Sequence, residues 1–357
     1  MFGVLRLEAF CTDALAILIK MKNIVLLCYG KEIEYNRAIV SILSFLAWNR
    51  KASTDFRIVC FTDNPAYLNK YLSDVKVEYI YLSPSRMNHM LGGTTYIHRR
   101  KICILQDVYL RYPEDDLIFL DSDTFFISHA HGFMKKLESG YAMMHEREYR
   151  IEEAPEIYRK YMSEKLENAA GYPLAFIRQI ESRTFAVKNE ELSFSIDQHV
   201  WNSGVLGLKN QFLPYLDSVL SLNDEFYKES KWFISEQLAF GLLLQQKTQI
   251  AESSAFVNHY HQSKHHVDPR INSLLDGEFL KMKLVEKLAC VKAFTVNVNK
   301  LVILDRSSMI AIGAFKRNNI IKGFKYAWNA LRSIPMHSMI YSYTKDRIAM
   351  MASNRRF

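Results

Sequence analysis

Residues 117–126, with the sequence LIFLDSDTFF, decide the fold of this chain. Apolar residues with strand propensity lead directly into Asp121, Ser122 and Asp123, and the chain then returns to β-branched and aromatic residues. We predict a buried strand that ends in two carboxylates, at the sheet edge where ligands bind in open α/β proteins. Two carboxylates this close repel one another unless a cation separates them, so the pair favours a divalent metal ion held by oxygen ligands. The alternative is a turn in which the aspartates hydrogen-bond only to the backbone.

The composition is that of a globular protein whose basic residues lie at one end. The chain has 357 residues, 49% of them hydrophobic and 24% charged, which suits one large domain with an appendage or two smaller domains. The formal net charge is +8, and ten Lys and Arg residues but only one acid, Asp346, lie between Arg306 and the end. The body is therefore about neutral. No stretch approaches the roughly 18 uninterrupted apolar residues that are typical of a membrane-spanning helix.

The cysteines and the first residues indicate a reducing compartment. The five cysteines are scattered and mostly lie within apolar runs, which is typical of buried thiols rather than of a disulfide framework. Residues 1–20 contain a short apolar run, but charged residues interrupt what precedes it, so we do not expect a signal peptide. We expect this leader to be of doubtful significance, with Met21 as the more natural start.

Strands and helices alternate through the first third of the chain. Apolar runs at residues 24–28, 57–61 and 75–82 predict strands, and the apolar spacing of residues 32–48 and 66–72 predicts helices between them. This alternation predicts an α/β protein with parallel strands and right-handed crossovers, in which the first hundred residues form a nucleotide-binding half. Further strands are expected at residues 142–144, 201–208 and 256–257, and further helices at residues 96–112, 212–229 and 233–244.

Two of the predicted helices begin with residues suited to a polar ligand. Arg99, Arg100 and Lys101 lie near the start of helix 96–112, where cations oppose the helix dipole unless an anion lies close by. A solvated basic face is the alternative. Glu236 and Gln237 lie near the start of helix 233–244, either as binding residues or as an ordinary first turn whose acid faces the dipole.

Two segments between these motifs also stand out. Asn202, Ser203 and Gly204 stand at the entrance of strand 201–208, where glycine either permits close approach of a ligand or marks a bulge. Residues 148–168 carry charges of alternating sign, which predicts an exposed helical segment that could cover an acceptor site.

A cluster of histidines follows strand 256–257. Four of the eleven histidines, His259, His261, His265 and His266, lie within eight residues, together with Lys264. A single histidine is usually structural. A strand that ends in such a cluster favours a ligand role for one of them.

The order of these motifs resembles that of a known enzyme family. An Asp-x-Asp strand, an Asn-Ser-Gly strand, an acid and Gln pair that opens a helix, and a His-Tyr followed by Lys resemble the GT-A glycosyltransferases. Residues 24–266 are most similar to the glycogenin-like and bacterial lipopolysaccharide galactosyl- and glucosyltransferases of family eight. The resemblance implies a GT-A catalytic domain over residues 21–269, with an α/β mixed sheet flanked by helices, and a helical basic C-terminal extension over residues 270–357.

The resemblance also implies a donor, a cofactor and the residues that bind them. The donor would be a nucleotide-diphosphate sugar, with UDP as the expected nucleotide, and Mn²⁺ or Mg²⁺ would bridge its diphosphate. Asp121, Asp123 and His259 would hold the metal. Lys264 would contact the diphosphate, Ser122 the bound donor, and Arg99 and Lys101 the nucleotide or donor sugar. Tyr29 and Gly30 would contact the base and ribose. The implied catalytic residues around the anomeric carbon are Asn202, Glu236 and Gln237.

The chain departs from the family pattern at two places. His259 and Lys264 lie five residues apart rather than six and lack the usual glycine between them, so either His259 or His261 can be the metal ligand. Glu236 replaces the common aspartate, which leaves retention or inversion of the anomeric carbon open. No residue stands out as the general base for the acceptor hydroxyl.

The basic tail predicts contact with a membrane surface. Residues 320–339 interleave aromatic and aliphatic residues with Lys322, Lys325 and Arg332, as segments that lie on anionic bilayers do. One alternative is a helix that packs on the body and exposes its basic face to solvent. Another is binding to nucleic acid, which a basic segment can also favour. Together with the resemblance, the tail predicts a cytoplasmic hexosyltransferase on the inner face of the plasma membrane, with no nucleic-acid partner. Its acceptor would be a glycan or glycolipid in surface polysaccharide or lipopolysaccharide synthesis.

Two other classes of protein remain in competition. The same ten residues are similar to the signature of haloacid-dehalogenase-type phosphatases, with Asp121 as nucleophile and Asp123 as acid and base. That fold places this strand first in its domain and needs a later acidic pair for Mg²⁺, whereas three predicted strands precede it here. A catalytically inactive basic adaptor is the third class.

Overall fold

The computed structural model describes residues 21–50, 55–162, 167–316 and 318–334. The leader, residues 1–20, lies outside this range, and so does the end of the predicted tail segment beyond residue 334. Statements about the structure below concern the described residues.

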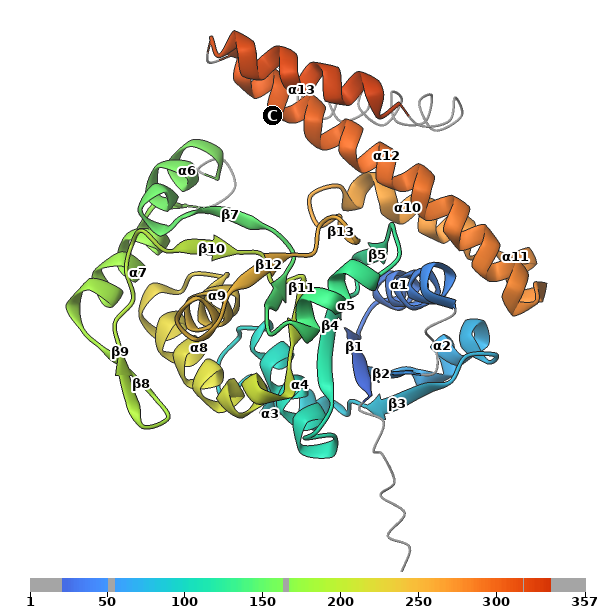
Figure 1. The fold of residues 1–357 in the computed structure, drawn as a ribbon, viewed down its shortest axis with the longest axis horizontal. Helices are drawn as coiled ribbons and strands as arrows, with labels where there is room; N and C mark the ends of the chain where they lie inside the picture. Colours follow the sequence, from blue (N-terminus) through green and yellow to red (C-terminus); the bar gives the residue numbers. More distant parts are fainter. Residues whose placement is uncertain (1–20, 51–54, 163–166, 317, 335–357) are drawn as a thin grey trace, which may run out of the picture.

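A seven-stranded mixed sheet forms the centre of the molecule (Figure 1). Its strands follow the order β12 (Ile250–Glu252), β6 (Ala142–Met144), β11 (Val205–Leu208), β4 (Asp116–Asp121), β1 (Lys22–Cys28), β2 (Phe56–Thr62) and β3 (Val77–Tyr81). The four strands β3, β2, β1 and β4 are parallel, with Leu26 beside Leu120, while β11 runs antiparallel to both β4 and β6. The α/β fold with a mixed sheet, predicted from the alternation and the resemblance, is confirmed.

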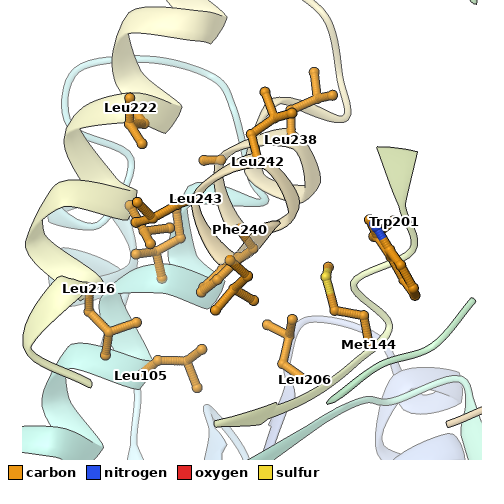
Figure 2. Packing of buried hydrophobic residues seen from close by; sticks show 14 of the residues in the cluster. Leu105, Met144, Trp201, Leu206, Leu216, Leu222, Leu238, Phe240, Leu242 and Leu243 are labelled. Atoms are coloured by element: carbon orange, nitrogen blue, oxygen red, sulfur yellow. The ribbon is translucent and has the colours of Figure 1, made fainter. Parts of the chain in front are cut away.

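Both faces of the sheet are covered, which explains why its central strands are apolar throughout rather than alternating. Ile24 and Leu26 of β1 lie in one core with helix α1 (Glu32–Asn49), while Val25 lies in the other core with helix α4 (Arg99–Arg111). Figure 2 shows the second core, in which Leu105 of α4 and Leu206 of β11 pack with leucines of helices α8 (Leu216–Ser230) and α9 (Ser235–Lys247). Packing on both faces of the sheet thus holds the carboxyl ends of the parallel strands in place.

The remaining elements surround this sheet. The other helices are α2 (Pro65–Leu72), α3 (Pro84–His89), α5 (His131–Glu138), α6 (Ala154–Tyr161), α7 (Gly171–Ser182), α10 (Lys264–Leu274), α11 (Gly277–Lys281), α12 (Leu284–Lys316) and α13 (Ile320–Arg332). Three strand pairs stand outside the main sheet: β10 (His199–Trp201) with β7 (Arg147–Arg150), β13 (Val257–His259) with β5 (Thr124–Phe126), and β8 (Phe185–Val187) with β9 (Glu190–Leu192). Short 3-10 helices cover Ile151–Glu153 and Asn210–Tyr215.

Two details of the predicted elements are wrong. The expected strand 201–208 is two strands, because the chain breaks at residues 202–204 and β10 leaves the main sheet to pair with β7. The charged segment 148–168 does not begin as a helix: residues Arg147–Arg150 form β7, and the charged helix α6 starts at Ala154. Both differences bring polar side chains to the end of β4.

The C-terminal helices form a pair that is anchored on the body. The first part of α12 packs on α1, with Leu288, Val291 and Val298 buried in the shared core. Helix α13 then runs back along the end of α12 (Figure 1), and Gly323 permits close contact because a Cβ there would lie 2.4 Å from the ring of Phe315. Over the described residues, the predicted helical extension is confirmed. None of the described helices combines the length and the apolar character that a bilayer crossing requires.

Candidate active site

The end of β4 turns the two aspartates in the direction of the histidine cluster. β4 ends at Asp121 and β5 begins at Thr124, so the intervening residues form a tight turn, closed by a 2.8 Å hydrogen bond from the Thr124 hydroxyl to the Asp121 carbonyl. The Asp123 side chain is 7% exposed and that of Asp121 is 28% exposed. The Ser122 hydroxyl points elsewhere and donates to Glu34 of α1 at 2.7 Å.

Strand pairing places His259 opposite this turn. β13 pairs antiparallel with β5, in a register that sets His259 beside Thr124. Its Nε2 lies 3.4 Å from Oδ1 of Asp123 and 3.9 Å from Oδ2 of Asp121. One ligand atom from each of these three side chains lies within 4.8 Å of the others.

Asn202 and Gly204 fix the orientation of the His259 ring. The Asn202 side-chain oxygen accepts a 3.0 Å hydrogen bond from the Gly204 amide and lies 2.8 Å from Nδ1 of His259. Because that oxygen can only accept, Nδ1 donates to it and Nε2 is the ring nitrogen that faces the two carboxylates. A Cβ at position 204 would lie 2.2 Å from the ring, so glycine is what lets His259 occupy this place.

These three side chains fit a divalent metal ion. Ligands of an octahedral ion with bonds of about 2.1 Å lie about 3 Å apart when adjacent and about 4.2 Å apart when opposite, and the distances at this site fall within that range or close to it. Carboxylate oxygens and a histidine nitrogen are ligands that suit Mn²⁺. The geometry brings together the predicted ligands Asp121, Asp123 and His259.

His261 occupies a different position. Its ring centroid lies 4.6 Å from that of His259, and it does not belong to the three-residue group around the aspartates. Burial lowers its pKa to about 4, so this imidazole is neutral at physiological pH. Of the two histidines that the sequence leaves open, the structure places His259 against the carboxylates.

Each of the two aspartates is paired with a lysine. Lys264 Nζ lies 2.8 Å from Oδ2 of Asp123. Burial acts to raise the pKa of Asp123, but the attraction of His259 and Lys264 outweighs it and holds this pKa well below its usual range. The buried Lys101 Nζ lies 3.2 Å from Asp121 and 3.4 Å from Glu236, and these two acids raise its pKa although burial opposes them. The site therefore holds fixed positive charge beside the candidate metal position.

Glu236 is a buried acid next to Lys101. It is 3% exposed, and the Ser203 hydroxyl donates to its Oε2 at 3.0 Å. Burial raises its pKa to about 7, against the opposing effect of Lys101. The backbone N–H of Glu236 donates to the hydroxyl of Tyr96 at 3.0 Å, which fixes the start of α9. Such an acid can change its protonation state near neutral pH.

Glu148 is exposed, as predicted for its segment, and it also belongs to the same polar network. Its carboxylate accepts hydrogen bonds from the side-chain amides of Asn202, at 3.3 Å, and Gln237, at 3.1 Å. Although the side chain is open to solvent, desolvation by the surrounding protein raises its pKa. The structure thus links Asn202, Gln237 and Glu148. The pairing of β7 with β10 brings Glu148 next to Asn202 and Gln237. The sequence around Glu148 therefore does not predict that it lies at the site.

The predicted nucleotide residues Tyr29 and Gly30 lie at the end of β1, next to Asp63 at the end of β2. Gly30 has a left-handed φ of 83°, and its N–H lies 3.0 Å from a carboxylate oxygen of Asp63 and 3.1 Å from the hydroxyl of Tyr35. The guanidinium of Arg100 lies 4.9 Å from the ring centre of Tyr29. Asp63 is not among the predicted site residues, because its Thr-Asp-Asn-Pro context is also typical of a plain turn.

Arg99 is the predicted site residue that the structure directs elsewhere. Its guanidinium binds both carboxylate oxygens of Asp224 on α8, at 2.8 and 2.9 Å, and donates to the Met90 carbonyl at 2.8 Å. The hydrogen bond to Asp224 raises its pKa. These contacts join α4 to α8, so the geometry gives Arg99 a structural role and leaves Lys101 as the cation of this helix at the carboxylates.

A cleft of about 480 Å³ opens beside His259. One wall contains His145, Glu148 and His261, and the other is formed by α12, which contributes Val302 and Arg306. Arg306 forms a two-pronged ion pair with Glu146, at 2.8 and 2.9 Å, and so joins α12 to the segment between β6 and β7. Most of the lining side chains are polar, which suits a hydroxyl-rich ligand.

Comparisons with known proteins show distant similarity to sugar transferases. No protein-family model and no curated protein sequence matches the chain. Among solved structures, mouse xyloside xylosyltransferase 1 is 12% identical with a TM-score of 0.39, and the alignment covers 65% of this chain and 84% of that one. The galactosyltransferase LgtC, solved with donor and acceptor sugar analogues, is 15% identical with a TM-score of 0.40, covering 65% and 73%. The glycosyltransferase GlyE of Streptococcus pneumoniae TIGR4 is 12% identical with a TM-score of 0.37, covering 75% and 53%.

Proposed function

We propose that this protein is a metal-dependent glycosyltransferase that moves a hexose from a nucleotide-diphosphate sugar to a glycan or glycolipid. The observation that carries the proposal is the convergence of Asp121, Asp123 and His259, with Nε2 of His259 directed at both carboxylates. This group lies at the carboxyl end of β4, where ligands of open α/β sheets bind. The motif order that resembles the GT-A transferases of family eight supports the same assignment.

The donor would lie across the ends of β1, β2 and β4. Tyr29 and Gly30, with Asp63 beside them, would contact the base and ribose, for which we propose uridine. Mn²⁺ or Mg²⁺ held by Asp121, Asp123 and His259 would neutralise the diphosphate and so stabilise it as a leaving group.

Two lysines and a polar pocket would act on the bound donor. Lys264 and Lys101 are fixed by the carboxylates and would stabilise the negative charge that develops on the diphosphate as the glycosidic bond breaks; one such donor is typically worth about 3 kcal/mol. Asn202, Glu236 and Gln237 would hold the hexose, with the buried Glu236 positioned by Ser203.

The acceptor would enter through the cleft between Glu148 and α12. Glu148 stands where the cleft meets the pocket of Asn202 and Gln237, and its carboxylate can accept a hydrogen bond from an acceptor hydroxyl. Polar residues along the cleft can bind further sugar hydroxyls. Glu148 is therefore the group we propose to orient the attacking hydroxyl.

The C-terminal helix pair would hold the enzyme on the inner face of the plasma membrane. α13 exposes a row of large apolar residues, Ile320, Ile321, Phe324, Trp328, Leu331 and, just beyond its end, Ile334. Lys322, Lys325 and Arg332 lie on the same short helix. Apolar and basic residues on one helix suit the surface of an anionic bilayer. We therefore propose a cytoplasmic, peripheral enzyme that builds surface polysaccharide or lipopolysaccharide.

A donor screen tests the proposal. UDP, GDP and CMP sugars with Mn²⁺ are added to the protein, and a rise in unfolding temperature reports binding to the native state. We expect a UDP-sugar to stabilise the protein only with Mn²⁺ present, and Asp123→Asn to abolish both this stabilisation and metal-dependent hydrolysis of the UDP-sugar.

The phosphatase alternative predicts a different outcome. It predicts hydrolysis of a generic phosphate ester such as p-nitrophenyl phosphate and no dependence on a sugar nucleotide. The described residues do not favour it, because β1, β2 and β3 precede β4, and Asp121 and Asp123 are grouped with a histidine rather than with a second pair of acids.

A further inference from the structure

The neighbouring residues His265 and His266 take no part in the site described above, yet they lie against an acid from a distant part of the chain. Both histidines are in the first turn of α10, and Asp305 comes from α12. One ligand atom from each of the three lies within 4.8 Å of the others. The cluster therefore connects the loop of the active site to the C-terminal helix pair.

The distances within this cluster suit a small tetrahedral metal ion. His266 Nε2 lies 3.6 Å from Asp305 Oδ1, and the ring centroids of His265 and His266 are 3.9 Å apart. Around a tetrahedral zinc ion with bonds of about 2.05 Å, neighbouring ligand atoms are about 3.3 Å apart. The 3.6 Å separation is close to this value, and the ligand atom of His265 lies within 4.8 Å of the other two.

The surroundings of the cluster resemble those of a built metal site. The Ser263 hydroxyl donates to Asp305 Oδ2 at 2.8 Å, which leaves Oδ1 facing His266. Such outer hydrogen bonds orient carboxylate ligands in metal sites. His266 is 0% and Asp305 is 5% exposed, whereas His265 is exposed to solvent and provides a path by which an ion can enter.

We propose that His265, His266 and Asp305 form a second metal site, separate from the site of Asp121 and Asp123, and that its ion is Zn²⁺. Two imidazoles and one carboxylate are a ligand set typical of zinc, with water at the fourth position. The ion would tie the first turn of α10 to α12. Lys264 lies in that same turn and is bonded to Asp123, so zinc would also fix the position of this lysine.

Metal counting on the full-length, tag-free protein tests this proposal. The wild type and the variants His265→Ala, Asp305→Asn and His131→Ala are dialysed to equilibrium against buffered Zn²⁺, and zinc per chain is measured by elemental analysis. His131 is an exposed histidine at the start of α5 and is the matched control. We expect His265→Ala and Asp305→Asn to hold one zinc fewer than the wild type and His131→Ala to hold the same amount. Ser263→Ala keeps all three ligands and should bind about 10- to 100-fold more weakly.

The design separates this site from the catalytic one. Any zinc that replaces Mn²⁺ at Asp121 and Asp123 is counted equally in all variants, so only the difference between variants matters. Co²⁺ in place of Zn²⁺ adds a spectroscopic signature, because tetrahedral Co²⁺ gives strong visible absorption that His265→Ala should remove. His265 is exposed, so its substitution is compatible with folding even if Asp305→Asn is not. An equal zinc count in the wild type and His265→Ala overturns the proposal, whatever the transferase assays show.

Discussion

Gly204 is the residue whose substitution tests the proposed catalytic metal site most directly. A Cβ atom at position 204 would lie 2.2 Å from Nδ1 and 2.3 Å from Cε1 of His259. Unbonded heavy atoms are comfortable at about 3.5 Å, so Gly204→Ala must displace the imidazole by about 1.3 Å. The φ angle of Gly204 is not positive, so alanine acts through the ring and not through backbone strain.

The displacement exceeds what a metal site tolerates. Ligand distances in metal sites are reproduced to about 0.2 Å, and a shift of the ring also breaks the hydrogen bond that orients it on Asn202. We expect the affinity for Mn²⁺ to fall at least about 10- to 100-fold. Transfer from the UDP-sugar should fall in parallel at limiting Mn²⁺ and recover in part when Mn²⁺ is raised.

Calorimetric titration with Mn²⁺ measures the effect, and Gly207→Ala is its control. Gly207 lies on β11, and a Cβ there would lie 2.9 Å from Met143 and Phe133 in the core, away from the metal ligands. Gly207→Ala should therefore lower the free energy of unfolding by about 1–3 kcal/mol through overpacking and leave Mn²⁺ affinity unchanged. Wild-type Mn²⁺ affinity in a folded Gly204→Ala protein refutes the assignment of His259 as a ligand.

Three further predictions concern the acceptor, the buried acid and the tail. Glu148→Gln should lower kcat/KM for the acceptor by about 100-fold and leave stabilisation by the UDP-sugar unchanged, because the carboxylate faces the cleft; an unchanged kcat/KM contradicts the role given to Glu148. Burial raises the pKa of Glu236 from 4.5 to about 7. Between these pH values the native state holds a proton that the unfolded chain has released. The free energy of unfolding therefore falls as pH rises from about 4.5 to about 7. Glu236→Gln should remove that part of the slope, as measured by urea unfolding at several pH values, and an identical slope argues against the raised pKa. Replacing Lys322, Lys325 and Arg332 by Gln should weaken binding to anionic vesicles by about 3 kcal/mol, or roughly 100-fold, in a sedimentation assay. Neutral vesicles serve as the control, and equal binding of the variant to anionic vesicles contradicts membrane contact through these cations.

The parts of the fold that depend on local patterns could be predicted from the sequence. The strands β1, β2 and β4 and the helix α1 each bury a continuous or periodic apolar set, and their boundaries differ from the prediction by one or two residues. Asp121 and Asp123 stand at the end of such a strand, so the position of the carboxylate pair could be predicted from the sequence. The helical nature of the C-terminal region was readable for the same reason.

The parts that depend on pairing between distant segments could not be predicted. The register of β13 on β5 places His259, and not His261, beside the carboxylates. The pairing of β7 with β10 brings Glu148 to the candidate site. The break at residues 202–204 was hidden because apolar residues stand on both sides of it. The resemblance implied that Arg99 contacts the nucleotide or donor sugar, whereas its side chain is bound by Asp224, which lies more than a hundred residues away.

α12 is one continuous helix that begins on the core beside α1, forms a wall of the cleft near Val302 and Arg306, and ends beneath α13. A continuous helix moves as a stiff rod, so a force applied at one end shifts every side chain along it. On the proposed function, detachment of α13 from a lipid surface would alter the width of the cleft proposed for the second substrate. The proposed choice of acceptor and the proposed place of the reaction would then depend on the same helix. Protein shortened to improve its handling would then report a selectivity that differs from that of the intact chain.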